Sequence, residues 1–101
     1  MKNVKVIWSR EALVDLETIY DFLAEQSPSA AQNVIENILS RASQLETFPE
    51  SGAMQLKLKI ADKEYRYLGE GNYKIIYRTT DQYAYIVTVF DTRRHPDKLK
   101  V

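Results

Sequence analysis

The sequence predicts an α+β domain in which an N-terminal strand precedes an antiparallel helical hairpin, packed on a mainly antiparallel sheet of four to five strands. Three observations predict it. Apolar residues recur twice at helical spacing in the first half of the chain, the hydrophobic period changes to two after residue 53, and the later strands have short links. At 101 residues, 45% of them hydrophobic, residues 1–101 are expected to form one domain.

The chain begins with a short strand followed by a helix. Val4, Val6 and Trp8 alternate with their neighbours as strand residues do. Ser9 then stands where a helix N-cap belongs, because its hydroxyl can accept a hydrogen bond from a free amide of the first turn. Residues 10–25 follow with an apolar stripe, which predicts an amphipathic helix. The members of this stripe are Leu13, Leu16, Tyr20 and Leu23, with Ala12 and Ile19 beside them.

A second helix is predicted to begin at Ser27-Pro28. Proline has no amide to lose at the first helical position, and a preceding serine can cap the helix. Pro49 and Gly52 end the helical pattern. Two helices joined by about three residues are expected to run antiparallel, and a sheet must cover their apolar stripes. The second stripe consists of Ala31, Val34, Ile35, Ile38, Leu39, Ala42 and Leu45.

The second half of the chain is predicted to form the sheet. Alternating residues indicate strands over 54–60 and 65–68, and a third strand is expected over 73–78. Residues 83–90 are an almost continuous apolar run, which is typical of a central strand covered on at least one face. Short turns between these segments favour antiparallel pairing.

The composition limits the possible functions. Without cysteine the chain has no disulfide, zinc-thiolate site, iron–sulfur cluster or thiol catalysis. The single histidine and the scattered acids form no ligand cluster, so we expect neither a metal nor a cofactor. No run of about 18 apolar residues occurs, and the N-terminus does not resemble a secretion signal, so we expect a cytoplasmic protein that does not enter the membrane.

The charges are balanced overall but divided between the two halves. Residues 1–53 hold four basic and eight acidic residues, a net charge of −4, whereas residues 54–101 hold ten and six, a net charge of +4. Such a division indicates a surface that faces a polyanion or an acidic partner, and an uneven distribution by chance is the alternative.

Five segments, in this order along the chain, resemble toxins of the RelE/ParE superfamily, which belong to type II toxin–antitoxin (plasmid stabilisation) systems. No segment is specific alone, but together they cover nearly the whole chain. They are Trp8-Ser9-x-x-Ala12-x-x-Asp15-Leu16-x-x-Ile19-Tyr20; Ser27-Pro28-Ser29-Ala30-Ala31; Leu45-x-x-Phe48-Pro49-x-x-Gly52; Tyr65-Arg66-x-Leu68 with Tyr73-Lys74-Ile75-Ile76-Tyr77-Arg78; and Val89-Phe90-Asp91-Thr92-Arg93-Arg94-x-Pro96.

The resemblance implies a growth inhibitor that is neutralised by a cognate antitoxin. ParE-like toxins poison DNA gyrase, whereas RelE-like toxins are enzymes that cut mRNA in the ribosomal decoding site. The Trp8-Ser9 segment, the start of the second helix and the Pro49-x-x-Gly52 segment look closer to the ParE-like branch, which we favour. The alternatives are a RelE-like endonuclease and an inactive family member that only binds its antitoxin. Because antitoxin arms are usually acidic, the basic half is expected to attract one.

If the chain is a nuclease, the resemblance implies Lys74, Arg93, Arg94 and His95 as its catalytic residues. Cleavage of RNA needs a base, an acid and cations that converge on one phosphate. Lys74 replaces an arginine of the nucleases, which turns a two-pronged phosphate grip into a point charge. A C-terminal tyrosine found in several nucleases is missing. An exposed turn residue is the alternative for His95.

Four further cations are candidates for binding a nucleic acid or another target: Lys57, Lys59, Arg66 and Arg78. Three of these four cations could instead have a purely structural role. Lys57 and Lys59 could lie on the solvated face of an edge strand, where lysine discourages unwanted pairing. Arg66 could pair with a nearby acid. The tyrosines between these cations could stack on bases, but they more often pack across strands.

Overall fold

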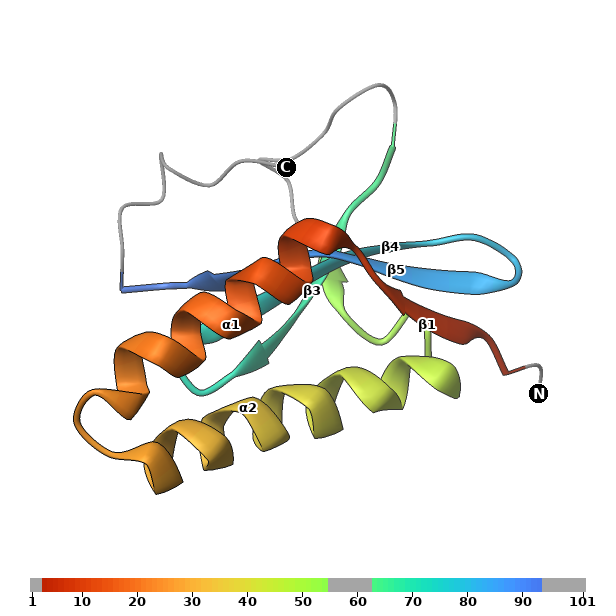
Figure 1. Cartoon of the computed structure of the whole chain (residues 1–101). Helices are drawn as coiled ribbons and strands as arrows, with labels where there is room; N and C mark the ends of the chain where they lie inside the picture. Colours follow the sequence, from red (N-terminus) through yellow and green to blue (C-terminus); the bar gives the residue numbers. More distant parts are fainter. Residues whose placement is uncertain (1–2, 55–62, 94–101) are drawn as a thin grey trace.

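A computed structural model describes residues 3–54 and 63–93. The elements follow in the order β1 (Lys5–Trp8), α1 (Arg10–Ala24), α2 (Pro28–Ser43), a short 3-10 helix η1 (Gln44–Glu46), β2 (Ala53–Met54), β3 (Arg66–Glu70), β4 (Tyr73–Thr79) and β5 (Tyr83–Asp91). Figure 1 shows the two helices as a hairpin on one side of the sheet. The predicted α+β architecture is confirmed.

The sheet has five strands in the order β1-β5-β4-β3-β2. The pairs β3–β4 and β4–β5 are antiparallel, as their short links predict, and β2–β3 is antiparallel as well. β1 instead pairs parallel with β5, so the first strand lies beside the last. The expected central position of residues 83–90 is confirmed, because β5 lies between β1 and β4. Most of the strand predicted over 54–60 lies outside the described residues.

Both predicted helix caps are present. The hydroxyl of Ser9 accepts a hydrogen bond from the Ala12 amide at 3.0 Å, and that of Ser27 accepts one from Ala30 at 3.2 Å. Pro28 occupies the first turn of α2, where its missing amide costs nothing. Ser9 Oγ also donates to the Val87 carbonyl at 3.0 Å. This bond ties the start of α1 to β5.

The core lies between the hairpin and the sheet. Ile38 and Leu45 from the helical layer pack against Ile75, Tyr77 and Ile86 from the central strands, and all five are fully buried. On α1 the buried residues are Ala12 and Leu16, with Ile19 packed beside them. The predicted stripe of α1 was therefore partly misplaced around the helix axis, since Leu13 is 53% exposed and Tyr20 is 38% exposed.

Candidate functional site

The sheet has a second face, turned away from the hairpin, which we call the outer face. Side chains alternate along a strand, so the burial of Ile75 and Tyr77 in the core places Lys74 and Arg78 on the outer side of β4. The pairing register extends this face across the neighbouring strands. Its members include Lys5 and Ile7 on β1, Tyr83 and Tyr85 on β5, Lys74, Ile76 and Arg78 on β4, and Tyr67 on β3.

Two cations of the outer face lie against tyrosine rings. Lys74 Nζ is 4.1 Å from the centre of the Tyr67 ring, and Arg78 Cζ is 4.7 Å from the centre of the Tyr85 ring. The ring of Tyr83 follows, with its centre 5.5 Å from that of Tyr85. Because the negative face of an aromatic ring attracts a cation, these contacts hold both charges in place on the sheet.

Arg66 faces the other side of the sheet. Its register partner is the buried Tyr77, and its Nη1 donates to the carbonyl of Gly52 at 3.0 Å and to that of Glu50 at 3.5 Å. Arg66 therefore ties down the loop that precedes β2. It does not use a carboxylate partner for these bonds, and it does not lie with Lys74 on the outer face.

Arg93 is held by Asp91 just beyond the end of β5. Its Nε and Nη2 each donate to one carboxylate oxygen of Asp91, both at 3.1 Å. This hydrogen bonding raises the pKa of the Arg93 guanidinium. Asp91 pairs in register with the buried Tyr73, so it belongs to the side of the sheet that the helices cover. Arg93 therefore lies with Asp91 and Tyr73, whereas Lys74 lies on the outer face.

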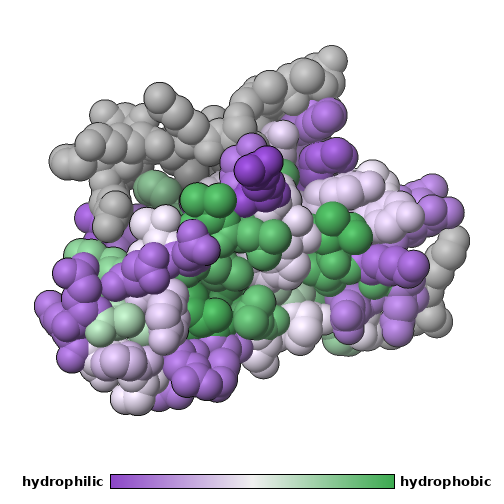
Figure 2. Space-filling view, viewed as in Figure 1, coloured by the Kyte–Doolittle hydropathy of each residue, from purple (hydrophilic) through white to green (hydrophobic). Residues whose placement is uncertain are grey.

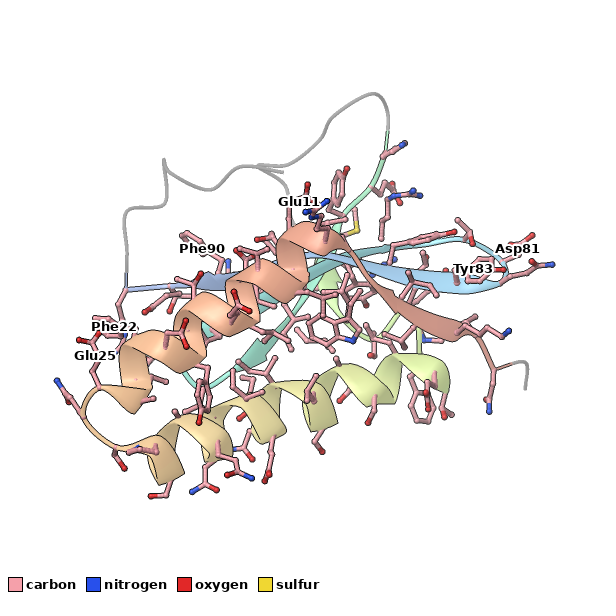
Figure 3. The ribbon with its side chains drawn as sticks, in the orientation of Figure 1. Glu11, Phe22, Glu25, Asp81, Tyr83 and Phe90 are labelled. Carbon is pink, nitrogen blue, oxygen red and sulfur yellow. The ribbon has the colours of Figure 1, made fainter. Side chains whose placement is uncertain are left out.

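Of the four residues predicted for catalysis, the structure describes Lys74 and Arg93, and it does not bring these two together. Phe90, the register partner of Lys74, lies at the opposite end of β5 from Tyr83 (Figure 3). Asp91 follows Phe90 and directs Arg93 to the other side. The remaining predicted residues, Lys57, Lys59, Arg94 and His95, lie outside the described residues.

A polar pocket of about 310 Å³ opens where β4 ends and β3 begins. Arg78 lines it together with Arg66, so the two arginines approach this pocket from opposite faces of the sheet. Two carboxylates balance most of the positive charge there. The complete lining is Glu50, Lys63, Glu64, Arg66, Arg78 and Thr79.

A second surface lies on the helical hairpin. Leu13 and Tyr20 are seven residues apart on one flank of α1, and Leu39 of α2 is 43% exposed. We call these three residues the hairpin stripe. Figure 2 shows hydrophobic residues gathered in the middle of this side of the molecule, with hydrophilic residues around them. The sequence pattern had assigned all three to the core, because periodicity does not separate a buried stripe from an exposed flank.

Comparison with known proteins identifies the family. The family model described as the ParE toxin of the type II toxin–antitoxin system parDE matches residues 6–96. The chain belongs to the ParE toxin family. This membership confirms the RelE/ParE resemblance of the sequence.

Two individual proteins are similar to this ParE-family chain. Toxin RelE2 of Caulobacter vibrioides is 36% identical over 50 residues, which make up 50% of this chain and 57% of that protein. The similarity thus spans little more than half the length of that relative. A solved structure described as the chromosomal ParDE TA system from P. aeruginosa matches with a TM-score of 0.70 at 19% identity, covering 87% of this chain and 95% of that one, which shows the shared fold.

Several residues of the ParE-like segments serve the fold in this family member. Ser9 caps α1, and Asp15 accepts hydrogen bonds from Thr88 and Val89 of β5. Gly52 donates its amide to the Tyr77 hydroxyl. The family signature therefore marks where helices and sheet are joined, which explains why it identifies the fold more readily than the target.

Two further observations concern the described part of the chain. Residues 3–54 and 63–93 contain no group of three or more histidine, cysteine or acidic side chains that could hold a metal ion. No helix in these ranges has the length and apolar character needed to cross a membrane.

Proposed function

We propose that this chain is the toxin of a toxin–antitoxin pair, that it arrests growth by inhibiting DNA gyrase, and that a cognate antitoxin neutralises it. The observation that supports gyrase over RNA is the separation of Lys74 from Arg93 on the two sides of the sheet. Cleavage of RNA needs cations that converge on one phosphate. Inhibition by binding to an enzyme needs no such convergence.

The alternative function is ribosome-dependent cleavage of mRNA. It is favoured by the cations Lys74 and Arg78 beside tyrosines on the outer face. Arg94 and His95 would supply its remaining catalytic groups. An inactive family member that binds only an antitoxin is the third candidate.

Expression of the chain alone in a bacterial host tests the choice. We expect growth arrest with gyrase-dependent DNA breaks and intact mRNA, and we expect the purified protein to inhibit supercoiling by gyrase. The double variant Arg93→Ala/His95→Ala should retain this inhibition, because neither residue belongs to the proposed binding function. Primer extension on cellular mRNA is the decisive measurement. Discrete breaks within codons that disappear in the double variant would establish the nuclease, and unaffected growth would establish the inactive module.

For the antitoxin, we propose that an amphipathic helix docks on the hairpin stripe. Leu13, Tyr20 and Leu39 are exposed apolar side chains on the two helices of the hairpin, which is the kind of surface that an amphipathic helix covers. The exposed acids Glu17 and Asp21 lie on the same helix, so basic residues are expected to flank the apolar side of the partner. The acidic arm expected from the charge of residues 54–101 stays a prediction for another segment of the antitoxin.

Leu39→Glu should weaken the complex with this antitoxin at least tenfold, because it places a charge in the apolar contact. The binding partner in this experiment is the protein encoded by the neighbouring reading frame, and calorimetry measures the dissociation constant. Ser40→Glu is the matched control, since it adds the same charge at an adjacent exposed position of α2. Equal affinities of the two variants would place the antitoxin helix elsewhere.

A further inference from the structure

The described charges of α1 and of the outer face are mostly of opposite sign. α1 exposes Glu11, Glu17 and Asp21 on the helical side of the molecule. The outer face carries Lys5, Lys74 and Arg78, and none of its described strand positions holds a carboxylate. Glu50 and Glu64 approach Arg78 from the loops that line the polar pocket at the end of β4. The outer face is therefore basic where α1 is mainly acidic, and Arg10, Arg66 and Arg93 are cations on the helical side that interrupt this division.

The cations of the outer face differ from the paired arginines in how they are held. Arg41, Arg66 and Arg93 each donate hydrogen bonds to carbonyl or carboxylate oxygens. Arg78 is held by the ring of Tyr85 instead, and within residues 3–54 and 63–93 no acceptor takes a hydrogen bond from it. Lys74 is held by Tyr67 in the same way. A ring contact fixes a cation but leaves its donors available for an oxyanion.

The arrangement of these cations suits an extended polyanion. Lys74 and Arg78 are four residues apart on β4, a separation of about 13 Å at about 3.3 Å per residue. One strand of duplex DNA presents a phosphate about every 3.4 Å along the helix axis, so about four base steps cover this separation. Lys5 lies two strands away from β4 and widens the positive surface. Tyrosine rings between the cations offer amphipathic area for sugars.

We propose that the outer face binds the phosphate backbone of duplex DNA through Lys74 and Arg78. Its role in the cell rests on the proposed function: an inhibitor of gyrase that also holds DNA would contact both components of the gyrase–DNA complex. DNA binding itself requires only the protein and a duplex. The two ideas can therefore fail separately.

Fluorescence polarisation with a labelled 20-base-pair duplex and the purified chain, without gyrase, tests the proposal. We expect binding that weakens with salt, because neutralised phosphates release counterions. Arg78→Gln and Lys74→Gln should each reduce the slope of log affinity against log salt by about 1. The control is Arg10→Gln, which removes the same charge from the helical layer and should leave the slope unchanged.

Three results would overturn the proposal. The first is no salt-dependent binding of the duplex by the unmodified chain. The second is an equal loss of slope in Arg78→Gln and Arg10→Gln, which would indicate a general effect of net charge. The third is binding of single-stranded RNA, or displacement of the duplex by polyglutamate, at tenfold lower concentration than the duplex requires. That result would assign the outer face to RNA or to an acidic polypeptide. Inhibition of supercoiling, measured separately, reports only on the proposed function.

Discussion

Replacing Asp15 with alanine is expected to lower the free energy of unfolding by about 3 kcal/mol, since it removes two hydrogen bonds to a charged acceptor and leaves their donors without a partner. Asp15 Oδ2 accepts from Thr88 Oγ1 at 2.5 Å and from the Val89 amide at 2.9 Å. Thr88 is buried, so water does not readily replace the lost acceptor. Chemical denaturation of the purified variant measures the change.

The position of Asp15 in the fold explains this large effect. β1 pairs with β5 only as far as Trp8 and Ile86, and the Ser9 amide then donates to the Ile86 carbonyl. Beyond this point no strand of residues 3–54 and 63–93 pairs with β5 on that side, and α1 contacts β5 instead. Asp15 satisfies the Val89 amide that a longer β1 would have bonded. The Asp15 carboxylate thus supplies the acceptor that a neighbouring strand would otherwise provide, and its hydrogen bonds join α1 to β5.

Three variants separate this role from general effects of charge on α1. Asp21→Ala, an exposed acid of the same helix, should change stability by no more than about 0.5 kcal/mol. Asp15→Asn should lose less than Asp15→Ala, because it keeps a neutral acceptor. Asp15→Ala combined with Thr88→Val should cost less than the sum of the single changes, as expected for directly coupled residues. Equal stability of Asp15→Ala and Asp21→Ala would contradict the assigned role.

Local patterns were sufficient for most of the secondary structure. Ser9 and Ser27 predicted where the two helices begin, because capping depends on a few adjacent residues. The antiparallel strands followed from alternation and short links. The parallel pairing of β1 with β5 could not be predicted in this way, since it joins residues such as Val6 and Ala84 from opposite ends of the chain.

The candidate site was predictable in part for the same reason. A period of two places Lys74 and Arg78 on one face, and the structure agrees. The direction of Arg66 depends on a loop that folds back to offer the Gly52 carbonyl, which no local pattern encodes. The register also shifts between Ile76 and Tyr77, where β5 carries an extra residue. Contacts between distant segments therefore decided which cations share a surface.

Gly52→Ala is the second change for which we expect a large effect, a loss of about 2–4 kcal/mol of stability from overpacking and a broken buried hydrogen bond. A Cβ atom on Gly52 would lie 2.6 Å from the Tyr67 carbonyl oxygen, 2.6 Å from the Tyr77 hydroxyl and 2.8 Å from Tyr77 Cε1. The carbonyl belongs to β3, and the Tyr77 side chain is fully buried. Neither neighbour can move aside without disturbing the sheet or the core.

The hydrogen bond at this position adds to the steric effect. The Gly52 amide donates to the Tyr77 hydroxyl at 2.9 Å, and Arg66 donates to the Gly52 carbonyl. A methyl group that pushes the loop outward would break the first bond and strain the second. Gly69→Ala is the matched control, since no atom lies within 4 Å of its added Cβ, and it should change stability by less than about 1 kcal/mol. Thermal or chemical unfolding of both variants gives the comparison, and equal stabilities would rule out the proposed close packing.

Tyr77 adds a pH dependence that can be checked on the same variants. Burial raises the pKa of its hydroxyl above the ordinary value of 10.0, although the Gly52 hydrogen bond acts in the opposite direction. The folded state therefore binds the phenolic proton more tightly than the unfolded state does. Its contribution to stability is complete below about pH 10 and decreases as the pH rises from there through the folded pKa.

Tyr77→Phe should remove this part of the alkaline loss of stability. It should also reduce the cost of Gly52→Ala, because the clashing hydroxyl is gone. If Tyr77→Phe left both the alkaline profile and the cost of Gly52→Ala unchanged, the Tyr77 hydroxyl would contribute to neither, and the clash with the Tyr67 carbonyl would remain as the cause of the cost.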